Sequence, residues 1–299
     1  MALIALASAA STTDDPEIKL LSEELVALGH EVGVEVWDDP DVDWHRYAVT
    51  VVRTTWDYTP RRDEFLAWAR RVPRLRNRAD VLTWNTHKTY LRDLAKHDCP
   101  IIPTAWDVTD EAALTAHATT LGLSVDDVEW VVKPAVSAGS ADTARWADPA
   151  DALEHSRSLV EAGRTSMLQP YVSTVDAEGE TAVLFAGGEY SHAVVKAAML
   201  APGEGLREGR DAREHLTATT PTAEQLTVAA QALRAARKSL GGGLDLLYAR
   251  VDLVTGADGT PQVMELELTE PALFLPYVDG AAATFAKAVT ASVASMGRL

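Results

Sequence analysis

The sequence has one cysteine, Cys99, among 299 residues, which excludes an intrachain disulfide and a cysteine-based zinc site. Basic residues are also few: 27 Lys and Arg stand against 44 Asp and Glu, a net charge of −17. Nucleic acid and anionic membranes need a basic face that neutralises phosphates, so we expect neither as a partner. No apolar run reaches the roughly 18 residues of a membrane span. We therefore expect a cytoplasmic protein.

Two common nucleotide-binding signatures are missing. The sequence has no Gly-x-Gly-x-x-Gly fingerprint and no Gly-Lys-Ser/Thr phosphate loop. Its composition is otherwise that of a globular protein, with 47% apolar and 24% charged residues. The apolar start, residues 1–10, resembles a short signal peptide but carries no Lys or Arg. We interpret it as a buried first strand.

Helix starts and strand-like runs alternate along the chain. A side-chain acceptor before a proline predicts a helix start, and four such pairs occur: Asp15-Pro16, Thr59-Pro60, Asp148-Pro149 and Thr220-Pro221. Strands are predicted at 2–8, 31–37, 48–53, 129–133, 165–170, 181–186, 190–196, 244–254 and 261–268. In the first third of the chain, the order of strands and helices predicts a parallel sheet of the α/β class. In the last third, the hairpin signals Gly187-Gly188 and Gly256–Gly259 predict antiparallel strands and therefore α+β structure.

Two boundaries divide the chain into three predicted domains. A helix is expected to start after Trp84, and a strand ends at Gln169-Pro170. We therefore expect an N-terminal domain over 1–84, a central domain over 85–168 and a C-terminal domain over 169–299.

Charged residues alternate with apolar ones in the last two predicted strands. Glu265 and Glu267 share one strand face, as do Arg250 and Asp252. If the loop between the strands has four residues, Asp252 lies opposite Val263 and Arg250 opposite Glu265. Three carboxylates on one face repel one another and suit a divalent cation with oxygen ligands. The alternative is a solvated strand face in which Arg250 makes ordinary salt bridges.

A second signal is an apolar strand that ends at Lys133 and continues into a loop of small residues. The loop includes Gly139 and Ser140. Small residues let the backbone approach a phosphate closely, and a lysine at a strand end can reach one. The alternative is a solvated lysine before a surface loop. Further on, Gln169 to Val172 could line an adenine pocket with Tyr171 packed on the base, or form an ordinary connector between domains.

The segment from Arg53 to Tyr58 follows a predicted parallel strand, and ligands bind at the carboxyl ends of such strands. Arg53 could hold a carboxylate and Asp57 an ammonium group. In the alternative interpretation Trp56 and Tyr58 cover the core, and Asp57 caps the next helix. His192 lies on a predicted strand as a packed or substrate-side histidine.

Taken in order along the chain, these segments resemble the ATP-grasp ligases. No single motif is specific, but the ordered set is, and it covers residues 88–271. Many members carry Glu-x-Asn where this chain has Glu265-Leu-Glu267, and both pairs can ligate Mg²⁺. The stretches 55–58, 179–180 and 191–196 are similar to those of the cyclo-ligases that act on O-ureido-D-serine in cycloserine biosynthesis.

The resemblance implies an ADP-forming carbon–nitrogen ligase that clamps ATP between the central and C-terminal domains, with ATP and two Mg²⁺ ions as cofactors. It implies an acyl phosphate made from a small amino-acid-like carboxylate and attacked by an amine of the same molecule. The implied residues are Lys88, Lys133, Gly139, Ser140, Gln169, Tyr171, Val172 and Glu180 for ATP; Asp252, Glu265 and Glu267 for metal; Arg250, Lys196 and Arg207 for catalysis; Arg53, Trp56, Asp57, Tyr58 and His192 for substrate.

Three other functions stay open at this point. They are an intermolecular carboxylate–amine ligase, a nucleotide-binding protein without catalysis, and a structural α/β protein with coincidental acidic strands. The loop 201–219, with its three arginines, is either a mobile lid that closes on phosphate or a disordered surface loop. A homodimer is a reasonable expectation, because two-fold dimers are the commonest soluble oligomers.

Overall fold

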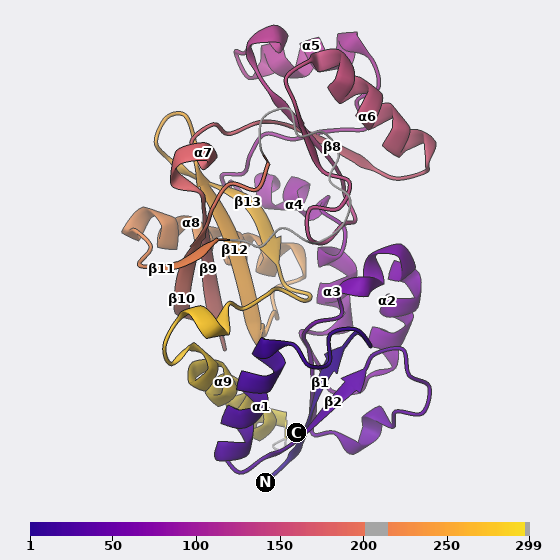
Figure 1. Cartoon of the computed structure of the whole chain (residues 1–299), viewed down its shortest axis with the longest axis vertical. Helices are drawn as coiled ribbons and strands as arrows, with labels where there is room; N and C mark the ends of the chain where they lie inside the picture. The colour runs from indigo at the N-terminus through magenta and orange to yellow at the C-terminus, as the bar shows by residue number, and fades with distance from the viewer. Residues whose placement is uncertain (201–214, 297–299) are drawn as a thin grey trace.

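The computed structural model describes residues 1–200 and 215–296. Its strands form three sheets, which follow one another along the long axis of the molecule (Figure 1). One sheet is parallel and two are antiparallel. This confirms the expected class, α/β followed by α+β.

The first sheet is parallel, with strand order β2-β1-β3-β4. Its strands are β1 (Leu3–Ser8), β2 (Glu31–Val36), β3 (Val49–Val52) and β4 (Leu75–Arg76). The flanking helices are α1 (Pro16–Ala27), α2 (Arg62–Arg71) and the C-terminal α9 (Ala281–Met296). Asp15 caps α1 as predicted, by accepting a hydrogen bond from the Glu17 amide. The predicted start at Thr59-Pro60 is wrong, because both residues lie in the short helix η2 (Trp56–Arg61).

The second sheet is antiparallel, with strand order β5-β8-β6-β7. Its strands are β5 (Ala105–Trp106), β6 (Trp130–Pro134), β7 (Ala144–Trp146) and β8 (Ser166–Pro170). The helices α5 (Glu111–Thr120) and α6 (Pro149–Glu161) bury their apolar residues against it. Asp148 caps α6 as predicted.

The third sheet is antiparallel, with strand order β11-β10-β9-β12-β13. Its strands are β9 (Glu180–Ala186), β10 (Glu189–Lys196), β11 (Leu216–Thr219), β12 (Tyr248–Thr255) and β13 (Pro261–Glu267). The hairpin at Gly187-Gly188 is confirmed, and both glycines have positive φ, at 60° and 87°. Two expectations are wrong here: β12 begins at Tyr248 rather than 244, and 216–219 form a strand rather than a loop.

Shorter elements connect the sheets. They are α3 (Ala79–Asn85), α4 (Tyr90–Lys96), α7 (Val175–Glu178), η1 (Trp44–Arg46), η3 (Val125–Asp127) and η4 (Leu275–Tyr277). The predicted helix start after Trp84 is wrong, because α3 ends at Asn85. The long helix α8 (Ala223–Ser239) starts after Thr222, whose side chain and that of Gln225 form a capping box. The predicted start at Thr220-Pro221 is therefore two residues too early.

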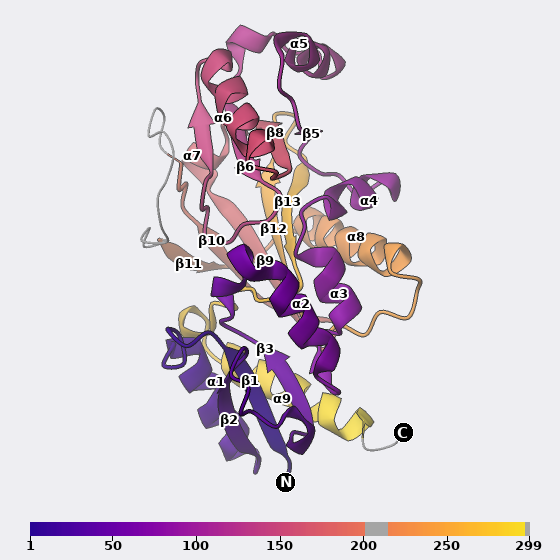
Figure 2. The same ribbon diagram turned by 90° about the vertical axis from the view of Figure 1, so that its right-hand side faces the viewer.

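The two faces of the third sheet have different roles. Odd-numbered residues of β12, such as Val251 and Leu253, pack in one core with α8, which runs along that side of the sheet (Figure 2). The opposite face carries the charged residues Arg250 and Asp252, because strand side chains alternate. The alternation seen in the sequence thus separates an apolar face from a charged one.

The division into domains at 84/85 and 168/169 stays a proposal. The three sheets follow it approximately, although β8 crosses the second boundary and α9 packs beside α1. Within residues 1–200 and 215–296, no helix is long and apolar enough to span a bilayer. Arg207, the third residue predicted to act in catalysis, lies outside the described residues.

Candidate active site

The charged face of the third sheet forms the floor of a cavity of about 1080 Å³. The strand register differs from the predicted one: Asp252 lies opposite Glu265, and Arg250 opposite Glu267. The loop between the strands is one residue longer than expected, and a bulge after Asp252 adds another shift. As a result, ligand oxygens of Asp252, Glu265 and Glu267 lie within 4.8 Å of one another.

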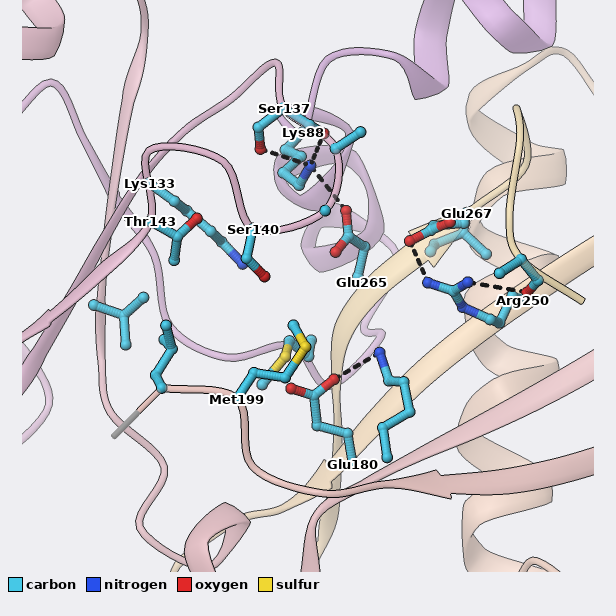
Figure 3. A pocket seen from close by; sticks show the side chains of 18 of the residues that line it. Lys88, Lys133, Ser137, Ser140, Thr143, Glu180, Met199, Arg250, Glu265 and Glu267 are labelled. Carbon is cyan, nitrogen blue, oxygen red and sulfur yellow. Dashed lines mark hydrogen bonds and ion pairs between the residues drawn. The ribbon is translucent and has the colours of Figure 1, made fainter. Parts of the chain in front are cut away.

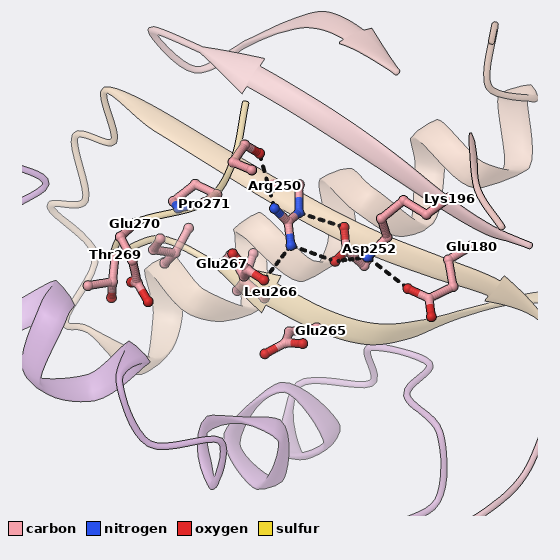
Figure 4. Close-up of polar contacts among 12 residues, drawn as sticks. Glu180, Lys196, Arg250, Asp252, Glu265, Leu266, Glu267, Thr269, Glu270 and Pro271 are labelled. Atoms are coloured by element: carbon pink, nitrogen blue, oxygen red, sulfur yellow. Dashed lines mark hydrogen bonds and ion pairs between the residues drawn. The ribbon is translucent and has the colours of Figure 1, made fainter. Parts of the chain in front are cut away.

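Two cations balance Asp252 at this floor (Figure 4). Arg250 donates to both carboxylate oxygens of Asp252, at 2.9 and 3.0 Å, and also to Glu267. The Nζ atom of Lys196 lies 2.8 Å from Asp252 and 2.8 Å from Glu180. Burial would raise the pKa of Asp252, but the two cations outweigh it and hold that pKa at about 2. Asp252 is therefore ionised and fixed at neutral pH.

The negative charge of Glu267 is less well compensated by neighbouring cations than that of Asp252. Burial raises its pKa to about 8, with the neighbouring carboxylates Glu265 and Asp252 adding to the shift against the opposing effect of Arg250. Such a crowded acid gains most from a bound divalent cation, which would replace the missing positive charge. The donor set is all oxygen and suits Mg²⁺.

Gly179 fixes the position of Glu180 beside Lys196. The glycine has φ of 73°, and a Cβ atom there would lie 2.3 Å from the Lys196 carbonyl oxygen. Only glycine permits this close approach of backbone to backbone at the start of β9. The Gly-Glu pair noted in the sequence thus has a structural reason.

Two lysines face the acids from the other side of the cavity (Figure 3). Lys88, in the linker between α3 and α4, lies 2.9 Å from Glu265 and donates to the Ser137 carbonyl oxygen at 3.0 Å. Lys133 on β6 is only 9% exposed, and burial lowers the pKa of its amine. Among the residues that the structure describes, no carboxylate lies within ion-pair distance of Lys133. Its ammonium group is positioned for an anion inside the cavity.

The loop after Lys133 adopts the strained backbone that small residues predict. Gly139 and Ser140 have φ of 62° and 58°, and both line the cavity. Ser137, which was not predicted, also lines it and accepts from Lys88. This loop therefore lines the cavity next to Lys88, which donates a hydrogen bond to it.

Residues 169–172, which connect the second sheet to the third, line the apolar end of the cavity. Gln169 donates to Thr104 at 2.8 Å, and the Tyr171 ring lies 3.5 Å from the Arg145 guanidinium. Apolar side chains surround this end: Ile102, Val131, Val172, Met199, Leu200 and Met264. A flat aromatic base fits such surroundings, since stacking and dispersion require little else.

Three predicted substrate residues do not line the cavity. Arg53 is 1% exposed and donates to the Pro271 carbonyl oxygen at 2.7 Å and to Glu17 at 3.3 Å. Asp57 accepts from Trp37 at 2.9 Å and from Arg61 at 2.7 Å. His192 is buried, with its Nε2 atom 2.7 Å from the Leu273 carbonyl oxygen. Arg53 and His192 are buried polar groups that need a partner inside the fold. Asp57 is only partly buried, and two neighbouring side chains engage its carboxylate.

The other predicted substrate residues, Trp56 and Tyr58, do line the cavity, next to an acid that sequence reasoning missed. Trp56 donates from Nε1 to the Glu270 carbonyl oxygen at 2.9 Å, and Tyr58 is a hydrogen-bond partner of the Glu270 carboxyl. The signal for Glu270 is the sequence Glu-Pro directly after the Glu-x-Glu strand. Its partners are more than 200 residues away in the sequence, so the pattern alone does not reveal them.

Comparison with known proteins gives concordant matches. Residues 4–79 match the family described as D-cycloserine synthetase DcsG, N-terminal domain. The cycloserine biosynthesis protein DcsG of Streptomyces lavendulae is 38% identical over 97% of this chain and 98% of its own length. A crystal structure of D-cycloserine synthetase DcsG superposes with a TM-score of 0.85 at 36% identity, covering 97% of this chain and 99% of that one. The D-alanine–D-alanine ligase of Bacillus anthracis shares the fold alone, with a TM-score of 0.65 at 16% identity, and the coverage is 100% and 98%.

Proposed function

We propose that this chain, which belongs to the D-cycloserine synthetase family of ATP-grasp ligases, converts O-ureido-D-serine to D-cycloserine. The class of enzyme is an ATP-dependent carbon–nitrogen ligase. The observation that carries the proposal is a single cavity that is lined by two lysines, by carboxylates of a three-acid cluster and, at one end, by apolar residues. Such a cavity can hold a nucleotide, a metal and a small carboxylate together.

ATP would lie between the second and third sheets. Gln169, Tyr171 and Val172 would line the adenine pocket, and Glu180 would accept a hydrogen bond from the ribose or the base. The phosphates would reach Lys133 and Lys88, with backbone N–H groups of the loop at 139–140 around them. Among the described residues Lys133 has no carboxylate within ion-pair distance, which supports this placement of the phosphates, because a buried lysine is costly without an anion.

The fold implies Mg²⁺ as well as ATP, and the donor set fits it. Asp252, Glu265 and Glu267 present oxygen ligands within 4.8 Å of one another. We propose that they hold two ions. Mg²⁺ bound there would supply positive charge that offsets the charge that develops during phosphoryl transfer.

The proposed reaction has three steps. A substrate carboxylate oxygen attacks the γ-phosphorus of ATP, and the bond to the departing ADP oxygen breaks. The nitrogen bonded to the side-chain oxygen then attacks the acyl carbon, loses its proton and expels phosphate. One water removes the carbamoyl group as ammonia and carbon dioxide, which leaves D-cycloserine. The cavity must keep water from the acyl phosphate until the ring has closed.

Arg250 is the residue we propose to touch the reacting centre. It lines the cavity, and its guanidinium is fixed by Asp252, Glu267 and the Ala272 carbonyl oxygen at 3.0 Å. A preorganised cation stabilises the oxyanion that forms when nitrogen attacks. Lys196 pairs with Asp252 and Glu180, so we assign it a positioning role.

The test is ADP release with Mg²⁺-ATP across a panel of amino-acid carboxylates that includes both enantiomers of O-ureidoserine. We expect release with the D compound alone, and loss of release on the order of 100-fold or more in Lys133→Met. Lys238→Met, which changes an exposed lysine on α8, is the matched control. Release that requires two separate substrates would replace cyclisation by an intermolecular ligation.

A further inference from the structure

Glu270 lies in the segment that follows β13, at the end of the cavity away from the adenine pocket. Its side chain is 9% exposed and lines the cavity. In Figure 4 it stands at the opposite end of the acid row from Glu180. Because Glu180 lies on the proposed nucleotide side, Glu270 faces the place left for the substrate.

The carboxyl group is held from the N-terminal part of the chain. Tyr58 is its hydrogen-bond partner, and Trp56 donates to the carbonyl oxygen of the same residue at 2.9 Å. The backbone beside it is fixed as well, since Arg53 donates to the Pro271 carbonyl oxygen at 2.7 Å. The position of Glu270 is therefore set by the fold.

Glu270 differs from the other acids of the cavity in its charge balance. Asp252, Glu265 and Glu267 each contact a lysine or arginine, and Glu180 pairs with Lys196. For Glu270, no lysine or arginine among residues 1–200 and 215–296 lies within ion-pair distance. A buried carboxylate without a cation is unfavourable, so a cationic group of a ligand would be bound strongly there.

We propose that Glu270, held by Tyr58, binds the α-ammonium group of the substrate and so selects a carboxylate that carries a free amine. This inference rests on the proposed function and adds the residue that recognises the amino acid. Asp57, the acid that the sequence suggests for this role, is already engaged by Trp37 and Arg61. Among the described residues that line the cavity, Glu270 is the acid that has no cationic partner of its own.

The electrostatics of the cavity agree with this assignment. Burial raises the pKa of Glu270 to about 7, while Lys88 acts in the opposite direction without contacting it. A substrate ammonium group would lower that pKa and keep the carboxylate ionised. The ammonium group and the acid would then neutralise each other beside the metal site.

The test compares O-ureido-D-serine with its analogue that lacks the amine, 3-(ureidooxy)propanoate, in the wild type and in Glu270→Gln. We expect the wild type to prefer the amino compound by about 100-fold in kcat/KM. In Glu270→Gln the preference should fall to roughly 3-fold, because the KM of the amino compound rises. The KM of ATP should stay within about twofold of the wild-type value. In Tyr58→Phe the ratio of kcat/KM for the two compounds should fall by roughly 3- to 10-fold. Glu189→Gln, at an exposed position on β10, is the matched control.

Calorimetric binding of both compounds in the presence of Mg²⁺ and a non-hydrolysable ATP analogue gives a second readout that does not depend on turnover. An unchanged preference in Glu270→Gln overturns the inference alone. An equal loss of kcat for both compounds also overturns it, because it indicates a general base instead. If the wild type releases ADP with neither compound, the proposed function fails and this inference fails with it.

Discussion

Asp252 on β12 is the direct cross-strand neighbour of Glu265 on β13. Two like charges 4 Å apart repel by about 4 kcal/mol at an effective dielectric of 20. The protein compensates with cations on both sides, Arg250 and Lys196 at Asp252 and Lys88 at Glu265. These cations keep the two carboxylates close together despite their repulsion, in an arrangement that suits a divalent ion.

Replacing Glu265 by Gln should remove a metal ligand and retain the fold. We expect turnover to fall on the order of 100-fold or more, and the Mg²⁺ concentration for half-maximal rate to rise by roughly 10-fold. Steady-state kinetics over a Mg²⁺ series, with circular dichroism as the check on folding, measures both. Glu189→Gln serves as the control for loss of one negative charge. Turnover at the wild-type rate would exclude Glu265 as a ligand.

Arg53 should act on stability and only indirectly on the substrate. It forms a buried pair with Glu17 and supports the backbone at Pro271. Arg53→Met leaves the Glu17 carboxylate buried without its cation, so the free energy of unfolding should fall by about 3–5 kcal/mol. Urea unfolding, compared with the exposed substitution Arg71→Met, tests this. Unchanged stability together with a higher substrate KM would restore Arg53 as a substrate-binding residue.

Glu270 should make the stability of the ligand-free protein depend on pH. Its pKa is raised by burial from 4.5 to about 7, so its neutral form stabilises the fold below about pH 4.5. That contribution is lost as the pH rises through 7, by up to about 3 kcal/mol. Relative to the wild type, Glu270→Gln should therefore gain stability between pH 5 and pH 8.

Urea unfolding of both proteins across this pH range gives the difference directly. The amino compound, added with Mg²⁺ and a non-hydrolysable ATP analogue, should remove most of the difference by binding the wild type more tightly. Parallel stability curves for the two ligand-free proteins would show that Glu270 is already ionised at pH 5, against its position in the structure.

Cys99 should be unreactive in the folded protein. It is 4% exposed, and burial raises the pKa of its thiol to about 12. At pH 8 the thiolate needed for alkylation is scarce and shielded. We expect iodoacetamide to label Cys99 only after unfolding in urea, as measured by mass spectrometry of the intact protein. Complete labelling of the folded protein within minutes would contradict this.

Local patterns predict the fold well where the determinants are local. Asp15-Pro16 starts a helix because the cap and the proline are adjacent in sequence, and Gly187-Gly188 makes a two-residue hairpin for the same reason. Thr59-Pro60 carries the same signature and fails. There the chain forms the short helix η2, in which Trp56 and Tyr58 face the cavity. Both side chains also bond to Glu270, a tertiary contact that the local cap-and-proline pattern does not include.

Part of the geometry of the candidate site follows from the sequence. Alternation along β12 and β13 identifies Asp252, Glu265 and Glu267 as neighbours, because it depends only on strand geometry. The register was wrong, since a bulge after Asp252 and a longer loop leave no distinct mark in the sequence. The charge of Arg53 is evident in the sequence, but its buried partners Glu17 and the Pro271 carbonyl oxygen are not, so the sequence alone favours a substrate role.

Product analysis tests the central claim most directly. The purified protein is incubated with Mg²⁺-ATP and O-ureido-D-serine, and ADP and D-cycloserine are quantified together by mass spectrometry, with the L enantiomer in parallel. We predict equal amounts of ADP and D-cycloserine from the D compound and neither from the L compound. ADP release without a cyclic product, or a product that requires a second amine, would contradict it.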